Sequence, residues 1–268
     1  MKLKTIKKNR KPKVWLFPNA IEREYVNYLR GIVENISKTV DEKLLEIQPH
    51  FKENVRQDSF SDTLERWLVE LLQAVLFFVD EKEIALFVQN YIRQTANFNS
   101  KQFHKVAKSV YGVNIFTTEP WLEEALRLAE WENIRLIKSI STQTLEKLRT
   151  RFVQAVRSGE RWENVVDDVK NILNVTDKRA TLIARDQVGK LNAHLTKLRQ
   201  QNVGVKSYIW RGMLDERERA HHVEREGRQF DWDDPPDDGH PGQPILCRCY
   251  AEAVFPEFKD LNGVIYAE

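Results

Sequence analysis

The residues best suited to chemistry gather near the end of the printed chain. Both cysteines and three of the six histidines lie in the stretch from His221 to Cys249. Thiolates and imidazoles are favoured zinc ligands, and two of each complete a tetrahedral structural site. The sequence therefore predicts one structural Zn²⁺ bound by His222, His240, Cys247 and Cys249. His221 and Asp215 are the substitutes if this ligand set fails.

A Cys-x-Cys pair is a less specific metal signal than two paired Cys-x-x-Cys knuckles. Two buried cysteines in a small core, with histidines on the surface, remain the alternative interpretation of the same residues.

Other kinds of catalysis are poorly indicated. Cys247 and Cys249 occupy an apolar stretch with no evident stabilisation of a thiolate, and the chain has no glycine-rich phosphate loop that ends in Lys-Ser or Lys-Thr. Histidines beside acids do resemble compact metal-dependent nuclease sites. Two thiolates instead favour a closed structural site, so we expect that the protein is not an enzyme. A metal-dependent nuclease remains the alternative.

A second cluster, at the start of the chain, is purely electrostatic. Residues 1–13 contain seven cationic side chains and no acid. Attraction to phosphates requires no folded structure, so this arm predicts contact with double-stranded DNA. A disordered arm without a partner is the alternative. The cationic residues are Lys2, Lys4, Lys7, Lys8, Arg10, Lys11 and Lys13.

The composition of the chain limits the class of protein that carries these two clusters. The chain has 268 residues, of which 41% are hydrophobic and 31% charged, enough for one large or two modest domains. No segment reaches the apolar run of about 18 residues that a membrane span needs, and the basic start lacks the apolar core of a signal peptide. Two cysteines one residue apart cannot form a disulfide framework, which favours synthesis in a reducing cytosol.

Helices must position these residues. Apolar side chains recur at helical spacing over most of residues 14–204. Pro49, Ser100 and Thr176 are expected to mark helix boundaries, because proline breaks helices and hydroxyl side chains cap them. The expected helices begin near Asn19, Leu64, Ile84, Phe103, Leu122, Leu145, Trp162 and Ala180.

The period changes after Gly204. Residues 205–210 and 245–254 alternate as strands do, with Cys247 and Cys249 on one face, and 233–244 form a loop. We therefore predict an α+β, mostly α fold, in which a structural metal stabilises a small C-terminal module. The expected divisions are a basic disordered arm (1–13), a helical N-terminal region (14–115), a second helical part (116–204) and the α+β module with the His/Cys cluster (205–268).

Several short motifs together resemble a known family. They are Ile183-Ala-Arg-Asp-Gln187, Asp215-x-Arg-x-Arg-x-x-His222, Gly227-x-x-Phe230 and Pro244-Ile-Leu-Cys-Arg-Cys249. This pattern, extending from about Trp131 to Phe255, resembles the Mu F-like head morphogenesis family of tailed bacteriophages, also called minor head or minor capsid proteins. By spacing, the histidine of the family's motif corresponds to His222.

The resemblance implies a structural virion protein of low copy number. Its expected partners are the portal protein and the scaffold or major capsid protein. Its expected location is the virion, in the head interior or at the portal vertex, after assembly in the host cytoplasm. A non-enzymatic DNA-binding virion protein is a further alternative that is compatible with this role.

Overall fold

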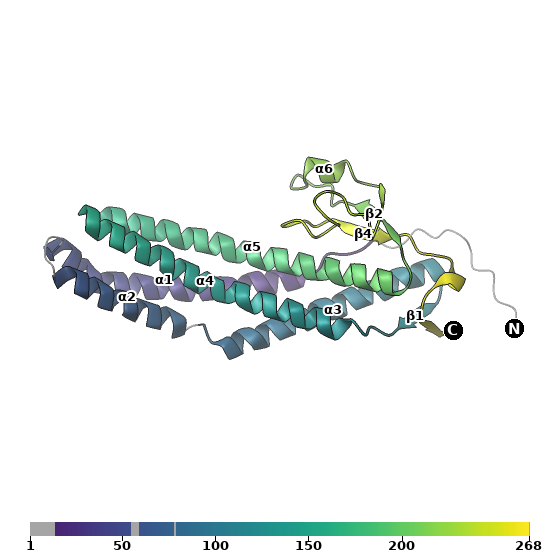
Figure 1. Cartoon of the computed structure of the whole chain (residues 1–268), viewed down its shortest axis with the longest axis horizontal. Helices are drawn as coiled ribbons and strands as arrows, with labels where there is room; N and C mark the ends of the chain where they lie inside the picture. The colour runs from purple at the N-terminus through teal and green to yellow at the C-terminus, as the bar shows by residue number, and fades with distance from the viewer. Residues whose placement is uncertain (1–13, 55–58, 78, 268) are drawn as a thin grey trace. The chain divides into compact units, whose positions relative to one another are not determined.

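The computed structural model of the chain describes residues 14–54, 59–77 and 79–267. These residues form mostly α-helix with a small antiparallel sheet near the C-terminal end, as the sequence predicts (Figure 1). The basic arm, residues 1–13, lies outside the described residues. The helices are α1 Asn19–Asn54, α2 Ser59–Phe77, α3 Glu81–Tyr111, α4 Leu122–Ser158, α5 Trp162–Asn202, α6 Ala220–Val223 and the 3₁₀ helix η1 Phe258–Asp260. The strands are β1 Asn114–Thr117, β2 Ser207–Arg211, β3 Gln229–Asp231, β4 Tyr250–Ala253 and β5 Val264–Ala267.

The chain divides into two compact units, each built from separate stretches of sequence. Unit 1 contains the described residues of Met1–Glu22, Asn90–Ala129 and Arg185–Glu268, and unit 2 contains those of Arg23–Gln89 and Glu130–Ala184. The unit borders fall inside α1, α3, α4 and α5. They therefore differ from the linear divisions at 115/116 and 204/205 that the change of sequence pattern indicates.

Some helix ends carry residue types that favour a boundary. Asp80 Oδ1 accepts a hydrogen bond of 2.8 Å from the Lys82 backbone N–H, and α3 begins at Glu81. Gly204 has a φ of +86°, which an L side chain rarely adopts, and the Val205 N–H returns to the Gln200 carbonyl. This left-handed residue ends α5 and turns the chain toward β2.

Other predicted helix ends are wrong, because the helices run on through them. α1 passes through the exposed Pro49, which lies between the buried Ile47 and Phe51. α5 passes through Thr176, whose hydroxyl donates to the Ile172 carbonyl at 2.9 Å. A threonine that bonds to the carbonyl four residues earlier fits inside a helix, so a capping residue type alone does not define a boundary. The predicted boundaries at Ser100 and between Ile140 and Leu145 are also absent, because α3 and α4 are continuous through these positions.

Unit 2 is a helical bundle with a mainly apolar interior. Its largest fully buried side chains include Tyr25, Leu29, Ile36, Leu71 and Phe152. Some polar side chains inside it lie close together, as where the Thr144 and Thr176 hydroxyl oxygens are 2.9 Å apart. Burial of apolar side chains at helical spacing is therefore what holds this unit together.

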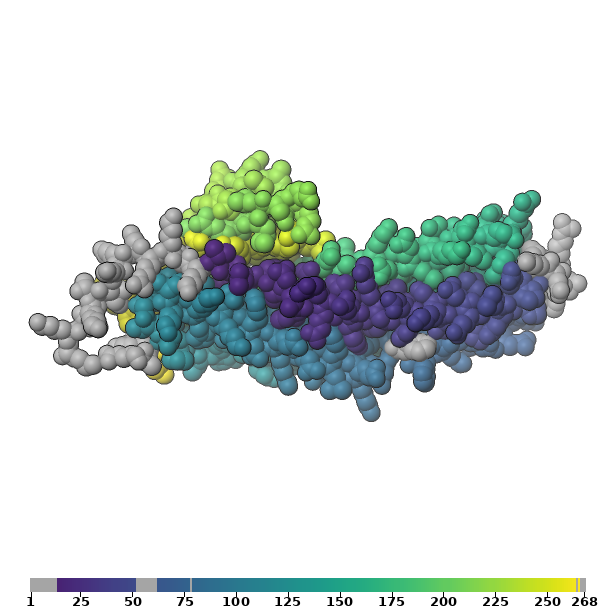
Figure 2. All heavy atoms as spheres, turned by 180° about the vertical axis from the view of Figure 1, so that it is seen from behind, coloured from purple at the N-terminus to yellow at the C-terminus, as the bar shows by residue number. Residues whose placement is uncertain are grey.

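Unit 1 contains the three-stranded sheet, whose strand order is β3-β2-β4 and whose pairs are antiparallel. Trp210 of β2 lies opposite Ala251 of β4, and the two strands lie side by side in Figure 1. Residues from about 205 to 253 gather into one lobe, green to yellow in Figure 2. Its core combines residues of α3, of the strands β2 and β4 and of the segments next to the strands: Phe103, Val106, Ala107, Tyr111, Val203, Val205, Tyr208, Trp210, Trp232, Cys247, Cys249 and Ala251.

The second predicted strand is shorter than expected. β4 begins only at Tyr250, and both cysteines lie in the irregular segment just before it. Leu246 has a φ of +58°, in the left-handed region, which interrupts a strand that would otherwise start at Ile245. The alternation still holds locally, because both cysteines point toward His222 while Arg248 between them binds Asp215.

Sequence patterns miss a second, two-stranded sheet in unit 1. It pairs β1 with β5, so that Asn114 lies opposite Ala267.

Within the described part of the chain, no helix is both long enough and apolar enough to cross a lipid bilayer.

Candidate metal centre

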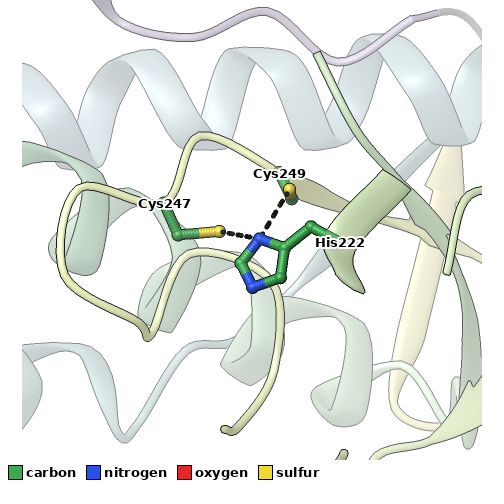
Figure 3. Close-up of side chains that lie close together, drawn as sticks. All are labelled: His222, Cys247 and Cys249. Atoms are coloured by element: carbon green, nitrogen blue, oxygen red, sulfur yellow. Dashed lines mark hydrogen bonds between the residues drawn. The ribbon is translucent and has the colours of Figure 1, made fainter. Parts of the chain in front are cut away.

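Three of the four predicted zinc ligands meet in unit 1. His222 Nδ1 lies 3.6 Å from Cys247 Sγ and 3.5 Å from Cys249 Sγ, as the two dashed lines in Figure 3 show. The histidine is 1% exposed and each cysteine 6%, so bulk water is nearly excluded from all three. A buried group of two thiols and one imidazole nitrogen could hold a metal ion.

The other nitrogen of His222 fixes which tautomer faces the thiols. Nε2 lies 2.9 Å from Asp238 Oδ2, and Arg225 holds the second carboxylate oxygen. A carboxylate only accepts hydrogen bonds, so Nε2 carries the proton and Nδ1 keeps its lone pair toward the sulfurs. Metal-binding histidines in proteins are commonly oriented by a carboxylate in this way.

The same carboxylate also accepts a hydrogen bond from His221 Nε2 at 3.0 Å. Burial raises the pKa of Asp238, but the hydrogen bonds from His222, Arg225 and His221 outweigh it and hold the pKa below its usual range. Asp238 therefore stays ionised at neutral pH and remains a strong acceptor for the His222 ring.

The two thiols are coupled through their proximity. The hydrogen bond that Cys249 donates lowers the pKa of Cys247 to about 6, and the Gly242 N–H, 3.3 Å from the sulfur, acts in the same direction. That hydrogen bond and burial both raise the pKa of Cys249. The pair therefore loses its first proton readily and holds the second, unless a cation compensates the second charge.

Aromatic packing holds the His222 ring in place. The ring packs against Trp210 with centroids 5.0 Å apart at 66°, and the Arg225 guanidinium lies over Trp210 at 5.0 Å. Trp210 itself is fully buried. A ligand whose rotamer is fixed by packing loses little entropy on binding a metal.

His240, the fourth predicted ligand, lies outside the His222/Cys247/Cys249 group. Lys197 Nζ donates to its Nε2 at 3.2 Å, so Nδ1 carries the proton and donates to the Tyr208 oxygen at 2.9 Å. Burial, followed by the Lys197 charge, lowers the pKa of His240 to about 4. His240 is thus a neutral, buried residue that fastens the loop before Cys247 to β2 and α5.

The two substitute ligands also serve other partners. Asp215 receives two hydrogen bonds from Arg248, at 2.6 and 2.5 Å, and these hold its pKa low. His221 is half-exposed and lies next to Asp238 rather than next to the sulfurs. With His222 and Asp238 it forms a second, more open group of potential ligand atoms.

Two residues of this site were not among the predicted ligands. Asp238 orients His222, and Glu218 Oε1 lies 3.3 Å from Cys249 Sγ. Carboxylates are abundant in this chain, with 40 Asp and Glu in all, so residue type alone could not identify them. The position of Glu218 within the Asp215–His222 motif was the one available signal.

Fold and site together define a class: a mostly helical protein that carries a buried His/Cys/Cys group in a small β-sheet module. Residues 146–252 of the chain match the family model described as Phage Mu protein F like protein. This match confirms, over that segment, the resemblance predicted from the sequence. The segment covers less than half of the chain and includes all three residues of the group.

A relative in Haemophilus influenzae, described only as an uncharacterized protein, is 42% identical over 131 residues. The aligned region covers 48% of this chain and 29% of that protein. The chain thus spans under a third of the relative's length. No solved structure matches the chain.

Proposed function

We propose that the protein is a minor head protein of a tailed bacteriophage or prophage, acting in head morphogenesis and in packaging or delivery of DNA. The observation that carries this proposal is the family match over residues 146–252, the segment that contains the His/Cys/Cys group. The partners we propose are the portal protein and the scaffold or major capsid protein. The location we propose is the head interior or the portal vertex.

Particle composition tests this role directly. The full chain, expressed together with the other head genes of its phage, should sediment with assembled heads and be detected in them by mass spectrometry. A chain that stays in the soluble fraction while portal and capsid proteins are recovered in heads would contradict the proposal. A head preparation made without the gene gives the background.

We further propose that His222, Cys247 and Cys249 bind one structural Zn²⁺ and that the protein is not an enzyme. Two thiolates and an imidazole match zinc better than they match Mg²⁺ or Ca²⁺, which prefer oxygen ligands. The distances between the sulfur and nitrogen atoms support the choice of zinc. In a tetrahedral site with ordinary bond lengths, sulfur and nitrogen ligands lie about 3.6 Å apart, close to the observed 3.5 and 3.6 Å.

Elemental analysis of protein purified without added metal tests the zinc. We expect about one equivalent in the wild type, a large loss in the Cys247→Ser/Cys249→Ser variant, and no loss in the control His50→Ala, an exposed histidine of α1. Less than about a tenth of an equivalent in the wild type would contradict a zinc site. Metal-dependent cleavage of DNA that disappears in His222→Ala would instead favour the nuclease alternative.

A further inference from the structure

We propose that Glu218 is the fourth ligand of this site and closes the coordination shell. The inference rests on the zinc proposed above and extends it, because three protein ligands alone leave a tetrahedral ion open to water. An open position favours catalysis and a closed one favours a structural role. The identity of the fourth ligand therefore decides which kind of zinc site this is.

The carboxylate is already next to the sulfurs. Glu218 Oε1 lies 3.3 Å from Cys249 Sγ, and oxygen and sulfur ligands of one tetrahedral zinc lie about 3.5 Å apart. Glu218, His222, Cys247 and Cys249 line a single small cavity. Its volume is about 20 Å³, which accommodates about one water molecule, so a single ion would fill it.

The segment that carries Glu218 is fastened to the segment that carries the cysteines. Arg248, between the two cysteines, binds both carboxylate oxygens of Asp215, and the Glu218 N–H closes a turn onto the Asp215 carbonyl at 3.0 Å. One residue further on, Arg219 donates to the Ile245 carbonyl at 2.6 Å. These contacts on both sides hold Glu218 close to Cys249, as preorganisation of a ligand requires.

Gly212 leaves the space that the carboxylate occupies. A Cβ atom at this position would lie 2.1 Å from Glu218 Oε1. The far end of the glutamate, rather than the backbone, would have to move. Any side chain at position 212 should therefore displace the carboxylate from the site.

Charge also supports a carboxylate ligand. Two thiolates and a carboxylate around Zn²⁺ leave one net negative charge. Arg217, Arg219 and Arg248 line the same cavity, and the Arg219 guanidinium donates to a neutral carbonyl. The surroundings are thus cationic enough to stabilise an anionic site.

Zinc affinity of the full chain, measured by competition with a chromophoric chelator, tests the role of Glu218. We expect Glu218→Ala and Glu218→Gln to weaken binding at least about tenfold, since loss of even an orienting outer residue costs that much. Gly212→Ala should weaken binding in the same direction. Glu216→Gln, an exposed carboxylate two residues away, is the matched control and should leave affinity unchanged.

Cobalt substitution gives an independent measurement, because the visible spectrum of Co²⁺ depends on the identity of its ligands. We expect the spectrum of Glu218→Gln to differ from that of the wild type while circular dichroism shows the same fold. If Glu218→Ala and Glu218→Gln bind zinc as tightly as the wild type, with unchanged cobalt spectra, water is the fourth ligand and our inference is overturned while the zinc site stands. A wild type that binds neither metal overturns the zinc proposal itself.

Discussion

His240 is the residue whose protonation the fold restricts most clearly. Its ring accepts a hydrogen bond from Lys197 and donates one to Tyr208, a pattern that only neutral imidazole satisfies. The charged groups that act on it are Lys197 of α5 and Asp233 of the neighbouring loop, and of these Lys197 has the larger effect on its pKa. Protonation would place a second cation beside a buried ammonium group.

The free energy of unfolding should therefore fall as the pH decreases from 6.5 toward about 4. His240 has a pKa of about 4 in the folded protein against 6.5 for the ordinary side chain, so the unfolded chain binds its proton first. The contribution of this neutral ring is fully present above pH 6.5 and is lost as pH falls toward 4. Since one pKa unit corresponds to about 1.4 kcal/mol, we expect a loss of about 1 kcal/mol or more in the free energy of unfolding.

Denaturant unfolding of the wild type and His240→Asn between pH 7 and pH 4 measures this effect. Asparagine retains a polar group at the position but does not titrate, so its stability should decline less over the same range. Parallel curves for the two proteins would show that His240 does not control the acid response.

The same residue shows what spacing can and cannot predict. His222, Cys247 and Cys249 were recognised because their types are rare in this chain and suit a metal. His240 belongs to the same types and is even closer in sequence to Cys247, yet Tyr208 and Lys197 hold it elsewhere. Those partners lie 32 and 43 residues away in the chain, so only the folded structure could identify them.

At the scale of the helices, the sequence predicts apolar faces better than it predicts ends. Asp80 and Gly204 stand at helix ends that their residue types favour, because each has a backbone role that few residue types perform. Thr176 was misread because its hydroxyl can either cap a helix or bond to the preceding turn, and neighbouring packing decides between them. The β1–β5 pair was missed because its strands lie nearly 150 residues apart in the chain.

The His/Cys/Cys group joins separate elements of the module, namely α6 and the segment just before β4. If a metal links them, its binding energy contributes to the folding of residues 205–255. We expect a strong chelator to increase amide hydrogen exchange in β2 and β4 and to leave exchange in α2, which belongs to unit 2, unchanged. Hydrogen exchange of the full chain by mass spectrometry measures both regions in one experiment.

The Cys247→Ser/Cys249→Ser variant supplies the control for that measurement. Without chelator, it should already exchange in β2 and β4 at the rate the wild type reaches with chelator. Unchanged protection of both strands after verified removal of the metal would mean that the core of aromatic residues holds the module without it.

For the whole molecule, local patterns predicted the class of fold but not the division into units. The change from helical to alternating periodicity after Gly204 correctly marks the start of the sheet. The borders of the two compact units fall within α1, α3, α4 and α5, where a helical pattern continues unbroken. The hydrophobic periodicity of a segment indicates whether it forms a helix or a strand. The division into units depends instead on which parts of a long helix pack together.

The basic arm remains a prediction about the whole molecule, because residues 1–13 lie outside the described part of the structure. Seven cations and no acid should bind DNA weakly and without sequence preference. If all seven contact phosphates, counterion release gives a slope of up to about −6 for log affinity against log salt on duplex DNA. Fluorescence anisotropy with a labelled duplex at several salt concentrations measures this slope.

A full-length variant in which the seven Lys and Arg residues of the arm are replaced by Gln is the matched control, since it keeps the length and removes only the charge. We expect the slope to become much shallower and the affinity at low salt to fall by more than about tenfold, because the phosphate contacts supply most non-specific binding. Equal binding by the two proteins at every salt concentration would show that any DNA contact lies elsewhere in the chain and that the arm has another role.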